Sequence, residues 1–157
     1  MSFNHFDNNG RAIMVDVSEK KKTMRTAVAA AHVRMHPDIL RTIIEGAASK
    51  GDVLGVARLA GISACKKTQE LIPLSHPLAI HHAAIDFDLD LPAGMIDIKA
   101  TVKAYERTGV EMEAMVAASI AALTVYDMCK GMDKGIEIRE VFLEYKDGGK
   151  SGLYLRS

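Results

Sequence analysis

Apolar and polar residues alternate in two neighbouring segments of the chain. Residues 85–91 read Ile-Asp-Phe-Asp-Leu-Asp-Leu, and residues 95–105 alternate in a similar way after the short connection at 92–94. Side chains along a strand point in turn to opposite faces of a sheet, so this pattern predicts two strands that each expose one face to water. The connection contains Pro and Gly, which predicts an antiparallel hairpin.

Other segments predict further strands and two helices. Weaker alternation predicts strands at residues 13–17, 24–35 and 136–145. Apolar residues recur at helical spacing from Pro37 to Ala47, which predicts one helix.

Asp52 can cap a second helix with apolar residues from 53 to 60, although Gly55 and Gly61 weaken that pattern. Helices and strands in this order predict an α+β fold in which helices pack on one face of an antiparallel sheet.

The longest apolar segment, residues 109–130, predicts a buried helix whose charges lie only at its ends. Glu111 and Glu113 begin it, and Asp127 and Lys130 end it. Asp127 follows Glu113 by fourteen positions, which corresponds to about 21 Å along a straight helix. Both ends can therefore serve one small substrate only if a second subunit brings its own helix end alongside.

Composition narrows the classes of partner. Lys and Arg number 20 and so do Asp and Glu, so nucleic acid and anionic membranes are not expected partners. The helix-length segment has only thirteen uncharged residues between its end charges, whereas a membrane span needs about 20. Two cysteines without a CxxC pair, and a polar start without a signal peptide, predict a cytoplasmic protein.

The chain is expected to form one domain over residues 1–157, because no repeat, low-complexity tract or linker divides it. Residues 1–10 are polar and are expected to form a mobile arm. At this length the hydrophobic core needs no metal or disulfide to stabilise it.

Residues 71–78 predict a loop of fixed shape, because Pro73 and Pro77 exclude a regular helix and disfavour a central strand. A side chain in such a loop is held in place at little entropic cost. His76 lies within it, and both a structural and a functional role are open for this residue.

Two other pairs of residues each allow two interpretations. Asp127 and Lys130 can form a surface ion pair, or they can be partly buried with a Lys pKa shifted toward acid–base chemistry. His81 and His82 can be a surface pair or part of a metal site.

The run Gly149-Lys150-Ser151 is not a P-loop, since Glu144 occupies the position that would require Gly. It can be a phosphate-binding turn or an ordinary solvated turn.

Several longer motifs resemble those of the cyclic pyranopterin monophosphate synthase (MoaC) family of molybdenum cofactor biosynthesis. The resemblance is carried by residues 71–78, 109–115 and 126–130, and it extends to residues 14–18, 50–53, 60–62 and 148–152. It runs almost from end to end, and the motifs follow the same order. The family usually has Cys in the proline loop where this chain has Ser75, so a required thiol at this position is in doubt.

The resemblance implies a ferredoxin-like fold and a homohexamer, arranged as a trimer of dimers, with active sites at subunit interfaces. It implies conversion of 3',8-cyclo-7,8-dihydroguanosine 5'-triphosphate into cyclic pyranopterin monophosphate with release of pyrophosphate. The chemistry calls for proton transfers and charge stabilisation. No redox cofactor and no protein-bound metal are implied, although Mg²⁺ can accompany the triphosphate.

The resemblance also assigns roles residue by residue. The catalytic positions are Asp127, Lys130 and Lys66. The substrate-binding positions are Leu74, Ser75, His76, Met112, Glu113, Lys50 and Arg25, of which the last two suit a triphosphate. We expect Lys130 to exchange protons with the rearranging ring while Asp127 sets its orientation and charge.

Two other classes of protein remain open at this point. A structural or small-ligand-binding α+β module would use the same interface without chemistry. A metal-dependent hydrolase would use His81, His82 and nearby aspartates.

Overall fold

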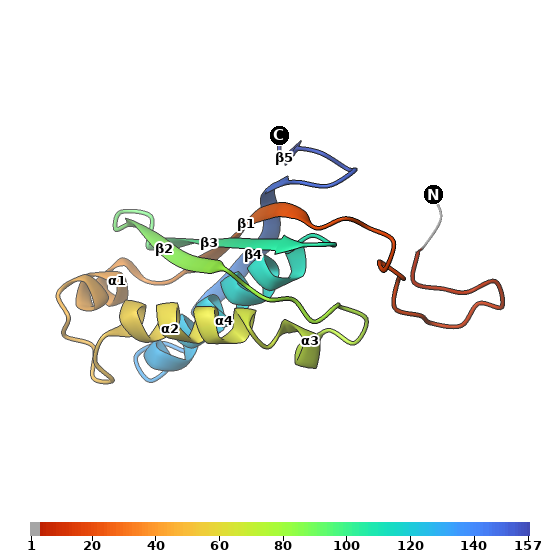
Figure 1. Ribbon diagram of the computed structural model, residues 1–157. Helices are drawn as coiled ribbons and strands as arrows, with labels where there is room; N and C mark the ends of the chain where they lie inside the picture. Colours follow the sequence, from red (N-terminus) through yellow and green to blue (C-terminus); the bar gives the residue numbers. More distant parts are fainter. Residues whose placement is uncertain (1–3) are drawn as a thin grey trace.

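The computed structural model describes residues 4–157 and contains one sheet with helices packed on it (Figure 1). The elements in chain order are β1 (Thr23–Arg34), α1 (Pro37–Ile44), α2 (Val53–Cys65), α3 (Thr68–Leu71), β2 (His82–Asp90), β3 (Met95–Glu106), α4 (Glu111–Cys129), β4 (Glu137–Asp147) and β5 (Tyr154–Leu155).

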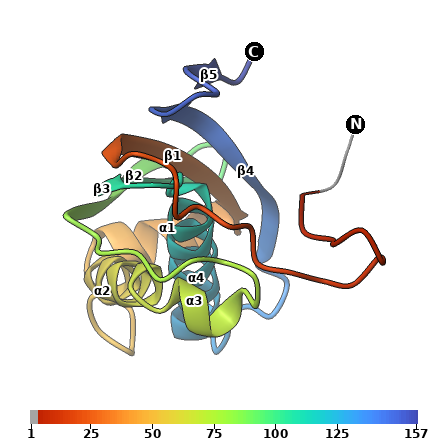
Figure 2. The same cartoon turned by 45° about the vertical axis from the view of Figure 1, so that its right-hand side comes forward.

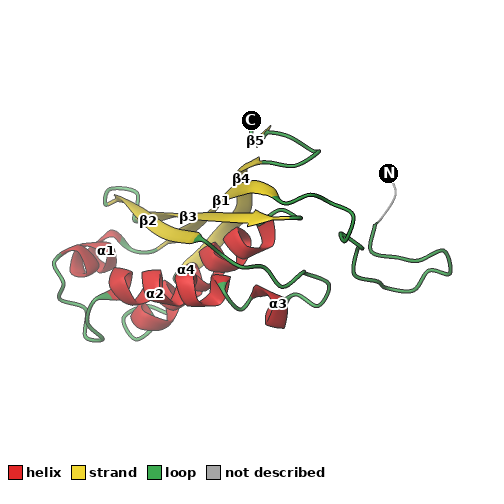
Figure 3. Cartoon of the chain, in the orientation of Figure 1, coloured by secondary structure: helices red, strands yellow, loops and turns green. Residues whose placement is uncertain are grey.

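The sheet has the strand order β2-β3-β1-β4-β5, and every neighbouring pair is antiparallel. Helices connect β1 to β2 and β3 to β4. This is the β-α-β-β-α-β arrangement of ferredoxin-like folds with a short fifth strand added. Both long helices lie on the same side of the sheet (Figures 2 and 3). The predicted α+β fold, the hairpin and the helices on one face are confirmed.

Strand β1 lies at the centre of the sheet and is rich in alanine. Ala27, Ala29 and Ala31 face the helices and are fully buried, and Ala30 on the opposite face is only 4% exposed. The small side chains let β3 and β4 flank this strand on both sides. The imperfect alternation of residues 24–35 therefore reflects a central strand with one face in the core and the other face only half-buried, apart from Ala30.

Helix α4 is the core helix. Its small and β-branched side chains are fully buried against the sheet and α2: Ala114, Ala117, Ala118, Ala121, Ala122 and Val125. Its length and composition would also suit a membrane span, but half of that length is buried inside the fold. A core helix explains this composition.

Gly61 lets α2 approach α4 closely. A Cβ atom at this position would lie 2.9 Å from the carbonyl O of Ala117 and 3.1 Å from Ile85. Helix α2 continues through Gly61 as far as Cys65, beyond the predicted end at residue 60. The glycine that weakened the helical pattern is thus the residue that fits the helix crossing.

The predicted strand at residues 13–17 is wrong. These residues run past the loop that follows α3 and pair with no strand; the nearest pairing is an isolated bridge between Phe6 and Ala12. Alternating residues also suit an extended segment that packs one side against the protein, and only a neighbouring strand would have made it part of a sheet.

The first ten residues include 1–3, which lie outside the described part of the chain. In residues 4–10 the carboxylate of Asp7 accepts hydrogen bonds from the backbone N–H groups of Asn9 and Arg11. The expected mobility of this arm stays a prediction.

Candidate active site

The proline loop after α3 has the fixed shape that its sequence predicts. Ser75 donates a side-chain hydrogen bond of 2.9 Å to the carbonyl O of Ile72, and its backbone N–H donates to the same oxygen. The ring Nε2 of His76 lies 2.6 Å from the carbonyl O of Val15. Because a carbonyl only accepts, this contact assigns the proton of the ring to Nε2 in the neutral tautomer. His76 therefore joins the loop to the N-terminal segment.

A pocket of about 800 Å³ opens between the proline loop and the first turn of α4. It brings together five of the predicted substrate-binding residues: Leu74, Ser75, His76, Met112 and Glu113. The N-terminal segment forms another wall with Val15, Val17 and Lys20. This volume is in the range of small-molecule binding sites.

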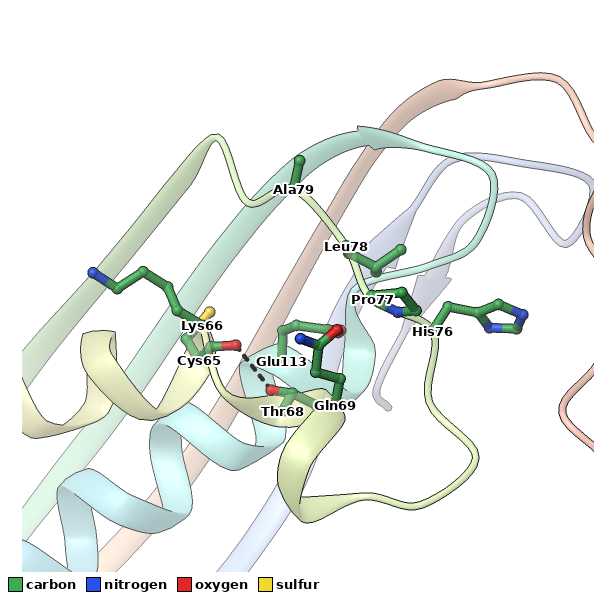
Figure 4. A pocket seen from close by; sticks show the side chains of 9 residues that line it. All are labelled: Cys65, Lys66, Thr68, Gln69, His76, Pro77, Leu78, Ala79 and Glu113. Carbon is green, nitrogen blue, oxygen red and sulfur yellow. Dashed lines mark hydrogen bonds between the residues drawn. The ribbon is translucent and has the colours of Figure 1, made fainter.

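A smaller cavity of about 350 Å³ adjoins this pocket and shares His76, Leu78 and Glu113 with it. It brings predicted Lys66, at the end of α2, to the same region (Figure 4). The Lys66 side chain extends away from Glu113 in this view, whereas Gln69 of α3 lies beside the Glu113 carboxyl group. Lys66 thus lines the site without neutralising that carboxylate.

Glu113 is the most unusual titratable group in the site. Its side chain is buried, with the residue only 4% exposed. Burial raises the pKa of Glu113 to about 7, its own backbone N–H opposes this shift in part, and the nearby charge of Glu111 adds to it. Within residues 4–157 no cationic side chain pairs with Glu113. A carboxyl group with such a pKa can both donate and accept a proton near neutral pH.

Glu111 differs although it lies in the same helical turn. Lys146 of β4 donates to its carboxylate over 2.6 Å. This ion pair leaves Glu113 as the carboxyl group that faces both cavities. The sequence could not reveal the pair, because it depends on how β4 passes the start of α4.

The opposite end of α4 carries a second cluster of predicted residues. Lys130 lies 2.6 Å from one carboxylate oxygen of Asp127, and Lys50 donates to the Asp127 backbone carbonyl over 2.8 Å. The hydrogen bond from Lys130 lowers the pKa of Asp127, and the same bond raises the pKa of Lys130.

In the single chain this cluster has the surface arrangement, one of the two interpretations that the sequence allows. The side chains of Asp127 and Lys130 are 56% and 50% exposed. Asp127 lies in the last turn of α4 and Lys130 is its C-cap residue. No other element of the described chain covers them, so water screens the pair. The pKa of Lys130 is therefore not shifted in the direction that acid–base chemistry would need.

The two clusters do not meet within one chain. Helix α4 is continuous from Glu111 to Cys129, so Glu113 and Asp127 lie about 21 Å apart along it. The separation predicted from the sequence holds, and each end of the helix carries only part of the predicted site.

Sequence comparison decides the family. The MoaC family model matches residues 14–149, which includes the proline loop and all of α4.

The chain belongs to the MoaC family. It is 67% identical over 156 residues to the cyclic pyranopterin monophosphate synthase of Geobacter sulfurreducens, with 99% of this chain and 98% of that protein covered. It is 69% identical to the protein of the same name from Geotalea uraniireducens, with the same coverage. The protein of that name from Clostridium botulinum is 54% identical, with 98% of this chain and 96% of that protein covered.

Arg25, assigned to the triphosphate through the MoaC resemblance, has a buried position. It is 8% exposed and donates to the carbonyl O atoms of Glu106 and Arg107 over 3.2 and 3.1 Å. Its guanidinium group thus ties β1 to the loop that leads into α4. A direct contact with phosphate stays a prediction for this residue.

His81 and His82, the basis of the alternative metal site, lie at the start of β2. The ring Nδ1 of His81 accepts a hydrogen bond of 3.4 Å from the backbone N–H of Tyr105. Within residues 4–157 no group of three His, Cys, Asp or Glu side chains is arranged to hold a metal ion. The histidine pair therefore has a structural contact but no ligand set around it.

Proposed function

We propose that this MoaC-family chain is a cyclic pyranopterin monophosphate synthase. It converts 3',8-cyclo-7,8-dihydroguanosine 5'-triphosphate into cyclic pyranopterin monophosphate and pyrophosphate, a step of molybdenum cofactor biosynthesis. The observation that carries the proposal is the pocket in which the proline loop meets the first turn of α4, with Glu113 buried and without a cation partner in the described chain. The names of the full-length relatives support the same activity.

The pocket suits a flat heterocycle. Leu74 and Met112 supply apolar walls, while Ser75, His76 and Glu113 supply polar groups. Opening an imidazole ring and closing a pyrazine ring requires protons to move on and off ring nitrogens. Glu113 titrates near neutral pH, so it can hold the proton in one step and release it in another.

Lys130 and Asp127 act on the ring from a second copy of the chain. Asp127 accepts the hydrogen bond that orients the Lys130 ammonium group. When a neighbouring copy covers this pair, loss of water lowers the pKa of Lys130 and makes proton transfer at neutral pH accessible. Lys66 lines the smaller cavity that adjoins this pocket and supplies a further cation there.

The assembly we propose is a homohexamer, a trimer of dimers with sites at subunit interfaces. Large apolar side chains on the outer faces of α2 and α4 support an interface: Val56, Leu59, Met112 and Leu123 are 42%, 68%, 40% and 52% exposed. Helices that carry apolar residues all round are normally covered. Light scattering on the purified protein tests the mass, and a monomer would contradict this proposal.

No redox cofactor takes part in the proposed reaction, because the rearrangement and the phosphate displacement involve no net electron transfer. Mg²⁺ accompanies the triphosphate as part of the substrate. The reaction takes place in the cytoplasm, in agreement with two reduced cysteines, Cys65 and Cys129, that are both buried. Turnover measured with and without a chelator tests the metal requirement.

The test of the function is direct. The purified protein is incubated with the cyclised guanosine triphosphate, and pyrophosphate and the pterin chromophore are followed with time. Both should appear in equal amounts. Release of pyrophosphate without the pterin, or no reaction, would overturn the proposal.

A further inference from the structure

The chain folds back on itself before it reaches the sheet, and residues 5–13 form a small N-terminal hairpin. Phe6 and Ala12 make an antiparallel bridge, and the backbone N–H of Ile13 donates to the carbonyl O of His5 over 2.9 Å. The hairpin is not part of the five-stranded sheet. A segment that is polar in sequence is therefore locally folded.

Two residues give the turn of this hairpin its shape. One carboxylate oxygen of Asp7 accepts hydrogen bonds of 2.8 Å from the backbone N–H groups of Asn9 and Arg11. Gly10 has a φ of +74°, in the left-handed region that favours glycine. A Cβ atom at Gly10 would meet nothing within 4 Å in the described part of the chain, so the glycine is needed for the backbone conformation alone.

One side of the hairpin faces the pocket between the proline loop and the first turn of α4. Asn4, His5 and Ala12 line this pocket together with Glu113. Neighbouring side chains of an extended segment point to opposite sides, and Phe6 lies outside the pocket lining and is 53% exposed. The hairpin therefore presents His5 to the pocket and Phe6 to the outside.

The segment that follows the hairpin ties it to the candidate active site. Nε2 of His76 in the proline loop lies 2.6 Å from the carbonyl O of Val15. Residues 8–14 are exposed, and the segment before β1 extends away from the sheet and the helices (Figure 1). A segment with so little buried contact opens at a small cost in free energy. The hairpin can thus open to admit a ligand while Val15 stays attached to the loop.

We propose that His5 is a further substrate-binding residue and that the N-terminal hairpin closes the pocket over the bound heterocycle. This inference rests on the proposed function and adds a contact to it. The motifs that carry the family resemblance begin at residue 14, and so does the match to the family model. Neither of them assigns a role to His5.

The chemistry of the pocket supports this position for an imidazole. Leu74 and Met112 supply apolar walls for the faces of a flat ring. A ring derived from guanine carries N–H groups and a carbonyl on its edge, and a neutral imidazole offers one N–H donor and one acceptor. Closure by the hairpin would also exclude water from the buried carboxyl group of Glu113. Loss of the His5 ring should therefore weaken substrate binding more than it slows the chemical steps.

Steady-state kinetics of His5 variants test the contact. His5→Ala should raise KM at least about fivefold with a smaller change in kcat, and His5→Gln, which keeps a donor and an acceptor, should recover most of this loss. The matched control is His82→Ala, because His82 is an exposed histidine of β2 that does not line the pocket. Its KM should stay within about twofold of wild type.

Three results of these measurements would overturn the contact. One is a wild-type KM in His5→Ala, and another is an equal increase in His82→Ala. The third is a KM of His5→Gln as high as that of His5→Ala, since a hydrogen-bonding role requires recovery. Circular dichroism melting curves of each variant establish that folded proteins are compared.

A glycine variant tests the hairpin without changing a residue that lines the pocket. Gly10→Val strains the turn, because a β-branched residue disfavours a positive φ. Gly46→Val is the matched control: Gly46 follows α1, has a φ of +66°, and likewise has nothing within 4 Å of its Cβ position in the described residues. Gly10→Val should raise KM as His5→Ala does, and Gly46→Val should not. Equal KM values in the two glycine variants would overturn the role of the hairpin.

Hydrogen exchange measures closure apart from turnover. Wild type is labelled with and without an excess of the cyclised guanosine triphosphate, so that the pocket holds substrate or product. The backbone amides of residues 5–13 should exchange at least about tenfold more slowly with the nucleotide. The turn at residues 92–94, between β2 and β3, is the internal control and should not change. Unchanged exchange in residues 5–13 would overturn the closure.

These results distinguish a failure of the hairpin from a failure of the function. If the wild type forms the pterin and pyrophosphate while His5→Ala keeps the wild-type KM, the His5 contact is wrong and the function stands. If the wild type shows no turnover, the proposed function is wrong, and hydrogen exchange still decides whether the hairpin closes over the nucleotide.

Discussion

The two ends of α4 carry carboxylates in opposite physical states. Glu113 at the first turn is buried and unpaired within the described chain, and burial raises its pKa to about 7. Asp127 near the last turn is exposed and held by Lys130 and Lys50, which lower its pKa. A carboxyl group can thus exchange protons near neutral pH at one end of α4, whereas at the other end it keeps its negative charge.

The difference shows why one chain is incomplete. The buried end has a pocket and a titrating acid, but Lys66 extends away from Glu113 and Lys146 is paired with Glu111. The exposed end has two lysines, and they line neither of the two cavities that Glu113 lines. Each end supplies what the other lacks, which is the physical argument for joining them across an interface.

The largest expected effect comes from removing the lysine at the exposed end. Lys130→Ala should reduce turnover by at least about 100-fold, because it removes a proton-transfer group, and the oligomer should stay intact. The neighbouring exposed lysine gives the control: Lys134→Ala should stay within about twofold of wild type. Product formation and light scattering are measured together, and normal turnover by Lys130→Ala would refute its assignment.

Mixed oligomers test the link between the two ends. Glu113→Ala and Lys130→Ala are each expected to be inactive. When the two chains are co-expressed, random assembly should restore about one quarter of the sites, since a site then needs one intact residue from each of two copies. Activity of the purified mixed oligomer, with each homogeneous variant as control, measures this. No recovery would show that both residues act within one chain or not at all.

Glu113→Gln tests the raised pKa of the buried end. The wild-type pH profile of kcat/KM should show an inflection near 7, and the residual activity of the variant should lack it, because an amide does not titrate. An inflection that persists in the variant would belong to another group.

The same variant carries a stability prediction. A carboxyl group whose pKa is higher in the folded than in the unfolded chain binds more protons when folded. The wild type should therefore lose stability as pH rises from about 5 to 8, by on the order of 2 kcal/mol relative to Glu113→Gln. Urea unfolding at a series of pH values measures this, and parallel pH dependence in the two proteins would contradict it.

Gly61 of α2 lies where that helix crosses the middle of α4. Gly61→Ala should lower the free energy of unfolding by about 1–3 kcal/mol, because the new methyl group overpacks against α4. Gly131→Ala is a suitable control, since a Cβ atom there meets nothing within 4 Å. Urea denaturation compares the two, and equal midpoints for Gly61→Ala and wild type would show that α2 can shift away from α4.

The smallest effect is expected for the loop residue that departs from the usual family pattern. Ser75 donates to the carbonyl O of Ile72, and a thiol donates more weakly, so Ser75→Cys should cost less than about 1 kcal/mol in stability. Its kcat/KM should stay within about threefold of wild type. A change in kcat/KM of tenfold or more would contradict this expectation and would show that the side chain at position 75 takes part in the chemistry.

Much of the fold could be predicted because local patterns coincide with the tertiary structure. The alternating segments 85–91 and 95–105 form the hairpin of β2 and β3, and the apolar run forms α4. The pattern failed at residues 13–17, where alternation reflects one-sided packing of an extended segment. Strand pairing depends on a neighbour that the segment itself does not encode.

The site could be predicted in its residues and only partly in its physical state. Motif resemblance named Glu113 and His76, and the structure places both at one pocket. The burial of Glu113 and the Lys146–Glu111 pair both depend on contacts between segments far apart in the chain. The spacing of residues along the sequence does not reveal such contacts. The separation of about 21 Å between the helix ends could be predicted, because it follows from the rise of an α-helix, about 1.5 Å per residue.

The hydrogen bond between His76 and Val15 has a practical consequence. Val15, Val17 and Lys20 line the pocket between the proline loop and α4, and they belong to no strand or helix. A chain shortened to begin at β1 would keep every regular element and would still lack one side of its binding site. For this protein, a cooperative melting curve therefore shows that the sheet and helices are folded, but it does not show that the binding pocket is complete.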